Sequence, residues 1–194
     1  MSDAPSTGSP PDAAKSHGRG TSPDGGDPFD RLGLAPRFDL EVSEIDRAWI
    51  RLAAACHPDR VSDPVEAVEA SARSAQLNEA RATLRDPERR ADRLLRRLGG
   101  PAAADETSLP PTFLAEVLEV RERVEEARGA DGDVRREIEK EVVSQRDACI
   151  ARVASLFLEG GGDSSRLRRI RLELNVWRYH ERLLAELRGT ASAR

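Results

Sequence analysis

Apolar positions recur every three to four residues along most of this chain, which is the period of an amphipathic α-helix. Asp27-Pro28 and Asp63-Pro64 each combine a capping residue with a proline at the first helical position, so each predicts a helix start. The first half of the chain is therefore expected to hold four helices, at residues 28–34, 42–56, 64–85 and 88–98. The second of these carries one stripe that we expect to be buried, formed by Ile45, Trp49, Leu52 and Cys56.

The second half of the chain shows three longer helical patterns, separated by short glycine-containing loops. Short loops favour antiparallel neighbours, which predicts a three-helix bundle. No segment has the alternating pattern of a β-strand, so the predicted fold class is all-α. The organisation that we expect is a disordered tail at 1–26, a first helical domain at 27–98, a linker at 99–110 and a bundle at 111–189 with helices at 111–128, 133–158 and 164–188.

Composition narrows the classes of function. The net charge of −4 speaks against a general nucleic-acid-binding protein, which would be basic overall. No apolar run is long enough to span a membrane, and the N-terminus lacks the hydrophobic segment of a signal peptide. Cys56 and Cys149 lie far apart and outside any CxxC pair, which favours a reducing compartment. We therefore expect a cytoplasmic protein that binds neither nucleic acid nor membrane.

The sequence offers no candidate for catalysis, for a cofactor or for a metal site. It contains no nucleotide-binding glycine motif and no recognisable order of nucleophile and base, so an enzyme is not expected. Cys56, His57 and Asp59 lie too close together on one turn to converge on a metal ion. Cys149 is expected to be a buried small hydrophobic residue, and His180 is expected on a helix surface.

The tripeptide His57-Pro58-Asp59 stands between the second and third predicted helices. Taken alone, it is compatible with an ordinary turn that ends a helix. A proline-stiffened loop between two antiparallel helices can, however, present His57 and Asp59 to a partner at little entropic cost. This arrangement resembles the J-domain, the module that engages DnaK-type chaperone ATPases.

The J-domain resemblance also assigns roles to arginines. It implies that the basic side of the second helix and its loop meets an acidic surface of the ATPase, through Arg47, Arg51 and Arg60. The alternative for Arg47 and Arg51 is an ordinary solvated helix face.

Further segments indicate one branch of the J-proteins. Residues 77–80 read Leu-Asn-Glu-Ala, and residues 90–95 read Arg-Ala-Asp-Arg-Leu-Leu before a glycine stop. General DnaJ proteins show Arg-Ala-x-Tyr-Asp there, and they carry Gly/Phe-rich and zinc-binding segments that this chain lacks. The pattern resembles the bacterial-type HscB family, J-type co-chaperones of iron–sulfur cluster assembly, as do residues 29–40, 113–122 and 177–184.

The helices of the bundle carry more apolar positions than one buried stripe needs. On the first helix, one stripe can dock it to its neighbours, formed by Phe113, Val117, Val120, Val124 and Ala127. A second stripe on the last helix contains Leu172, Val176, Tyr179 and Leu183. These additional positions either form an exposed docking patch or pack against the J-domain. By resemblance, the patch would hold an IscU-like iron–sulfur scaffold through Leu114, Ala115, Leu118 and Tyr179, with Glu119, Glu122 and Glu126 as its rim.

The resemblance implies a co-chaperone that stimulates a DnaK/HscA-type ATPase and delivers an iron–sulfur scaffold to it. Two positions depart from the family pattern: Ala115 stands where methionine is usual, and Cys56 replaces an aromatic residue before the tripeptide. The first alternative is therefore a J-domain adaptor with a client outside iron–sulfur assembly. The second is a structural helical protein in which the tripeptide is only a turn.

Overall fold

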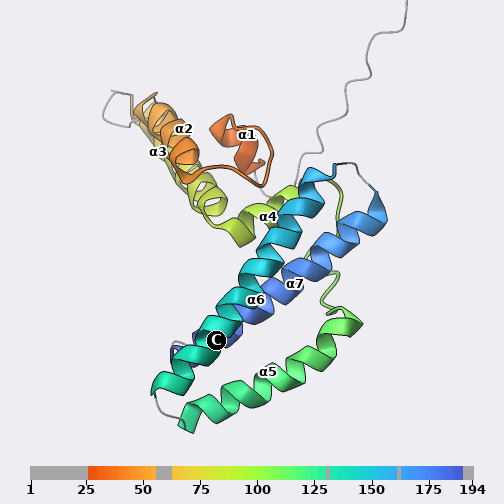
Figure 1. Cartoon of the computed structure of the whole chain (residues 1–194). Helices are drawn as coiled ribbons and strands as arrows, with labels where there is room; N and C mark the ends of the chain where they lie inside the picture. Colours follow the sequence, from red (N-terminus) through yellow and green to blue (C-terminus); the bar gives the residue numbers. More distant parts are fainter. Residues whose placement is uncertain (1–25, 56–62, 130–131, 161–162, 190–194) are drawn as a thin grey trace, which may run out of the picture.

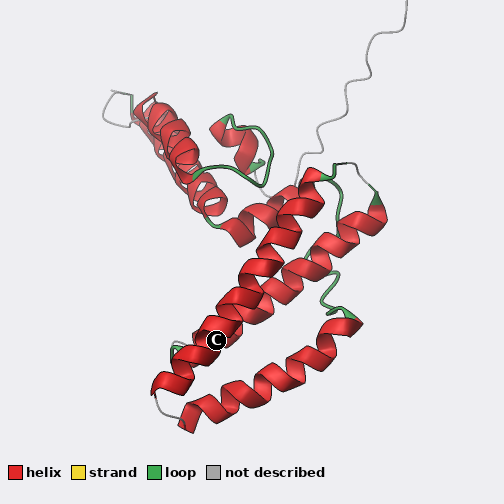
Figure 2. Ribbon diagram, in the orientation of Figure 1, coloured by secondary structure: helices red, strands yellow, loops and turns green. Residues whose placement is uncertain are grey.

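The chain folds into helices joined by loops, as Figures 1 and 2 show. The computed structural model describes residues 26–55, 63–129, 132–160 and 163–189. Within these ranges it has no β-strand, which confirms the all-α prediction. The predicted tail lies outside the described residues except for Gly26. The helices are α1 (Pro28–Leu32), α2 (Val42–Ala55), α3 (Pro64–Arg85), α4 (Pro87–Arg97), α5 (Pro111–Gly129), α6 (Gly132–Leu158) and α7 (Ser164–Leu187).

Aspartate caps fix the starts of α1, α3 and α4. Asp27 Oδ1 accepts a hydrogen bond from the backbone N–H of Phe29 at 2.9 Å, and Asp63 caps α3 in the same way. Asp86 is also a cap, so α4 begins at Pro87, one residue before its predicted start. In each case the capping carboxylate satisfies a backbone donor that the first turn of a helix leaves unpaired.

The N-terminal half consists of α1 packed against an antiparallel α2–α3 hairpin (Figure 1). Helix α1 ends at Leu32, two residues before its predicted end, because Gly33 adopts a left-handed φ of +63°. Ile45 of α2 is fully buried in the core of this half, while Trp49 and Leu52 are half-buried at its edge. The predicted stripe on α2 therefore faces the core, with Cys56 outside the described residues.

Helices α5, α6 and α7 form the predicted antiparallel bundle, in which α6 and α7 lie side by side over most of their length (Figure 1). Helix α5 docks through the stripe that the sequence predicted, because Phe113, Val120 and Val124 are buried and Val117 is half-buried. The side chain of Ala127 lies outside the described part of the chain.

For the second stripe of α7 the sequence left open an exposed patch or packing against the first domain, and the structure favours packing. Val176 and Leu183 are buried, Val176 in a core cluster with Trp177 and Leu183 in another with Val124. The reason is that α4, α5 and α6 all pack on α7, so this helix is covered on several sides. Val176 and Leu183 therefore stabilise the fold, while Leu172 and Tyr179 of the same stripe are half-buried.

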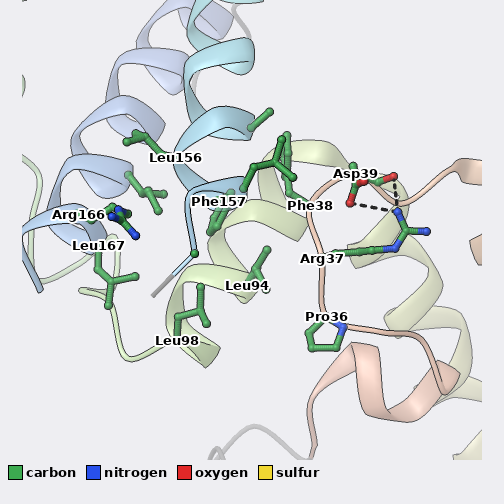
Figure 3. Close-up of a pocket in the computed structure, with 14 residues that line it drawn as sticks. Pro36, Arg37, Phe38, Asp39, Leu94, Leu98, Leu156, Phe157, Arg166 and Leu167 are labelled. Carbon is green, nitrogen blue, oxygen red and sulfur yellow. Dashed lines mark hydrogen bonds and ion pairs between the residues drawn. The ribbon is translucent and has the colours of Figure 1, made fainter. Parts of the chain in front are cut away.

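The two halves meet where α4 packs on α6 and α7. Leu95 of α4 is fully buried in the core cluster of the bundle, and the ring of Phe38 stacks on that of Phe157 with centroids 5.6 Å apart. Figure 3 shows this joint, with Leu94 and Leu98 of α4 facing the same pocket as Phe157. The joint buries apolar surface from both halves, which holds the hairpin against the bundle.

Polar contacts reinforce the same joint. The side chain of Arg171 on α7 is fully buried, forms an ion pair with Asp92 on α4, and donates to the carbonyl of Pro101 at 3.1 Å. Asn175 Nδ2, also on α7, donates to the carbonyls of Glu106 and Ser108 at 3.0 and 2.9 Å. The segment between α4 and α5 is thereby held along α7.

Candidate functional site

The outer face of α2 carries cationic side chains without acidic partners. Arg47 and Arg51 are exposed and lie one helical turn apart. Neither has an ion pair or a side-chain hydrogen bond in the part of the chain that the structure describes. On the side of α2 that α3 reaches, Arg81 and Arg85 lie 2.9 and 3.1 Å from Asp46, and the hydrogen bond from Arg81 lowers the pKa of that carboxyl group. The hairpin therefore pairs its internal charges and leaves two arginines exposed to solvent.

Contacts between α2 and α3 fix which side of α2 faces solvent. The indole N–H of Trp49 donates to Asn78 Oδ1 at 2.8 Å, and the guanidinium of Arg81 lies 4.3 Å from the centroid of the Trp49 ring. Asn78 belongs to the Leu-Asn-Glu-Ala segment that the sequence singled out, and these contacts give it a structural role. Because Trp49 is held on the α3 side, Arg47 and Arg51 point away from the hairpin.

The tripeptide of the predicted site falls between the described ranges. His57, Pro58, Asp59 and Arg60 lie outside the described residues, as does Cys56. Helix α2 ends and α3 begins at the same end of the hairpin (Figure 1). The structure thus gives the helices that flank the tripeptide and the outward face of α2.

A second candidate face lies on α5. Leu114 and Leu118 are 51% and 66% exposed, and Ala115 between them is exposed as well. Glu119 and Glu122 are exposed beside them. Leu118 and Glu122 line one shallow surface hollow together with Arg121 and Glu125, and the side chain of Glu126 lies outside the described part of the chain. Of the two alternatives that the sequence left open, this side of α5 is the exposed one, an apolar strip bordered by Glu119 and Glu122, with Arg121 at the same hollow.

Comparison with known proteins identifies the family. The family model for the DnaJ domain matches residues 27–92, and the model described as the HSCB C-terminal oligomerisation domain matches residues 109–188. A co-chaperone protein HscB homolog from Bordetella petrii is 33% identical over 170 residues, which cover 86% of this chain and 97% of that protein. Its counterpart from Burkholderia mallei is 34% identical over 163 residues, covering 82% and 90%. The chain belongs to the HscB co-chaperone family.

Solved structures agree in fold. The chaperone HscB from Vibrio cholerae has a TM-score of 0.68 at 24% identity, covering 84% of this chain and 96% of that one. The human co-chaperone HscB has a TM-score of 0.71 at 21% identity, covering 92% and 93%. In this HscB-family chain the N-terminal hairpin is thus a J-domain, which implies a DnaK-type chaperone as its partner.

Tyr179, which the HscB resemblance assigned to the scaffold-binding patch, is half-buried. Its ring meets that of Phe113 edge-on, with centroids 5.7 Å apart. It lines a hollow between α7 and the segment before α5, together with Leu109 and Arg182. The hollow at Leu118 contains none of these residues, so Tyr179 and the α5 strip do not line one common hollow.

The expectation for His180 was wrong. Its side chain is buried, with its ring 5.3 Å from that of Phe113, because α5 covers this side of α7. Burial is the main reason that the pKa of His180 is lowered to about 4. The imidazole is therefore neutral near pH 7 and belongs to the core of this HscB-family bundle.

Cys149 is buried, as the sequence predicted, and burial raises the pKa of its thiol to about 12. Such a thiol is uncharged near neutral pH and unreactive. Among the described residues no group of His, Cys, Asp and Glu side chains could hold a metal ion, and no helix is long and apolar enough to cross a membrane.

Proposed function

We propose that this HscB-family protein stimulates the ATPase of a DnaK/HscA-type chaperone and delivers an IscU-like iron–sulfur scaffold to it. In this proposal the protein itself carries out no bond-making chemistry and works in the cytoplasm. Each proposed domain has one role in this mechanism. Residues 27–98 act on the chaperone, residues 99–110 connect the two domains, and residues 111–189 bind the scaffold.

The observation that carries the chaperone half of the proposal is a pair of arginines on α2 that have no acidic partner within the described ranges. Arg47 and Arg51 stand in a hairpin whose other arginines, such as Arg81 and Arg85, are engaged by a carboxylate. Exposed cations at a rigid spacing favour an acidic partner surface, because they accelerate encounter and fix the register of docking. They lie on the helix that leads to His57 and Asp59, the residues we propose to act on the ATPase.

The scaffold half of the proposal rests on the exposed strip of α5. Leu114, Ala115 and Leu118 offer apolar contact area that the bundle does not use, and Glu119 and Glu122 border it. An apolar centre with a polar rim is the usual composition of a protein-docking site. The alanine at 115 makes this strip smaller than one with methionine there, and truncating such a side chain weakens docking by about 1–2 kcal/mol.

Steady-state ATP hydrolysis with purified chaperone, scaffold and this protein tests the proposal. We expect stimulation by the wild type, loss of stimulation with His57→Gln, and further stimulation when scaffold is added. Leu118→Arg should abolish the scaffold-dependent part and leave the basal stimulation intact. Stimulation that survives His57→Gln would exclude the mechanism.

The smaller α5 strip at Ala115 keeps one alternative open, a J-domain adaptor whose client lies outside iron–sulfur assembly. Pull-down of purified scaffold by the wild type and by Leu118→Arg separates the two. Retention by the wild type alone supports scaffold delivery, whereas ATPase stimulation without any scaffold retention supports the adaptor.

A further inference from the structure

A branched apolar side chain, Ile50, stands on the outer face of α2 with 58% of its surface exposed. Helical spacing places it next to Arg47, three residues before it. A single exposed apolar residue is ordinary on a protein surface. Ile50 is unusual because its neighbour Arg47 has no ion pair among the described residues, and because isoleucine has a lower helix propensity than lysine, arginine or glutamate at an exposed position.

The exposure of Ile50 is built into the packing of α2. The two preceding residues face the core and α3. Ala48 is buried, and Trp49 is held by its hydrogen bond to Asn78 and its contact with Arg81. Successive positions on a helix are about 100° apart, so Ile50 cannot turn into the core without breaking these contacts. The apolar side chain is therefore presented to solvent by a rigid helix.

We propose that Ile50 is an apolar anchor of the chaperone-binding face, and that the surface it fits is an acidic patch containing an apolar recess. The inference rests on the proposed function, because the occupant is the DnaK-type ATPase domain. Exposed ion pairs contribute little affinity each, whereas an apolar side chain that fills a desolvated recess contributes much more. The arginines would set the approach and register, and Ile50 would select a chaperone whose acidic patch has the matching recess.

Affinity for a purified DnaK/HscA-type chaperone, measured with the full chain at several salt concentrations, tests the anchor. We expect Ile50→Ala to bind about tenfold more weakly at every salt concentration, because three carbon atoms of contact are lost. The slope of log affinity against log salt should stay as in the wild type. Ile50→Leu, which keeps the apolar area, should bind within about twofold of the wild type.

Two variants serve as controls. Val134→Ala removes a β-branched side chain that is 50% exposed at the start of α6, and it should bind as the wild type does. Arg47→Ala should reduce the salt slope, because it removes a charge from the contact. Circular dichroism melting curves for all variants check that each one is folded.

The possible results distinguish a failure of the Ile50 anchor from a failure of the proposed chaperone-binding function. If Arg47→Ala weakens binding and Ile50→Ala does not, the anchor is wrong while the chaperone-binding function stands. If the wild type binds no DnaK-type chaperone, both are wrong. If Ile50→Ala changes only self-association in sedimentation, Ile50 belongs to a contact between copies of the chain and the proposal is overturned.

Discussion

His180 lies inside the bundle as a neutral imidazole. Its pKa is lowered to about 4, first by burial and then by the positive charges of Arg152 and Arg146, while Glu173 acts in the opposite direction. In the unfolded chain a histidine titrates near 6.5. Between these values the unfolded state binds a proton that the folded state does not, so the free energy of unfolding falls as the pH falls. Above 6.5 the contribution of His180 is fully present.

We therefore expect the bundle to lose stability on mild acidification through this one residue. From roughly pH 7.5 to roughly pH 5 the loss should be about 2 kcal/mol, and His180→Leu should lack this part of the pH dependence. Urea unfolding of both proteins at the two pH values measures it. Equal losses in the wild type and in His180→Leu would contradict the assignment.

The burial of His180 shows that the buried face of a helix cannot be predicted from one apolar stripe in the sequence. Leu174 and Trp177 are buried on α7 and spaced by three, and a further step of four leads to Glu181. The structure continues by three to His180 and then by four to Leu184, both buried. The period of 3.6 allows either step, and only the neighbouring α5, through Phe113, decides between them.

At the scale of single elements, the junction after α4 depends on close packing at Gly100. A Cβ atom at this position would lie 2.3 Å from Leu95 Cδ1 and 2.7 Å from Leu95 Cγ. Leu95 is fully buried where α4 meets the bundle, and Gly100 N–H donates to its carbonyl at 2.9 Å. The sequence predicts a helix stop from the glycine pair, but the closeness of Gly100 to Leu95 is a property of the folded chain.

Gly100→Ala should destabilise the protein by about 1–3 kcal/mol, because the added methyl group must displace Leu95 from a packed core. Gly132→Ala is the matched control, since its Cβ would meet nothing within 4 Å. That change should be neutral or slightly stabilising through the unfolded state. Denaturant midpoints compare the two, and equal midpoints would show that the junction has room for a side chain.

At the scale of the whole molecule, local signals predicted the helices well because caps such as Asp27 and Asp63 act within one turn. The same signals did not show how the halves are joined. The composition of residues 99–110 is that of a flexible linker, yet Asn175 and Arg171 hold this segment along α7. Contacts between residues about 70 positions apart produce no periodic pattern in the sequence. The orientation of the J-domain on the bundle can therefore be seen only in the folded structure.

Ion pairs between α4 and α7 make this orientation a testable property. Asp92→Ala would leave the buried guanidinium of Arg171 without its carboxylate, which should cost about 3 kcal/mol or more. Glu88→Ala removes the more exposed pair with Arg178, 2.7 Å apart, and gives a milder variant that keeps the fold. Spin labels at exposed Arg73 and Lys140 report the distance between the hairpin and the bundle.

We expect the distance distribution to broaden in the Glu88 and Asp92 variants and to stay narrow in Arg168→Ala, which removes an exposed pair with Glu106 outside α4. The proposed function then gives a second readout. A chaperone bound at α2 and a scaffold bound at α5 can act together only if both faces keep a defined relative position. Loosening α4 on α7 should therefore lower the scaffold-dependent part of ATPase stimulation while each partner binds separately as before. Unchanged distances with full stimulation in both variants would mean that the apolar contacts of Leu95 and Phe38 suffice to hold the two halves together.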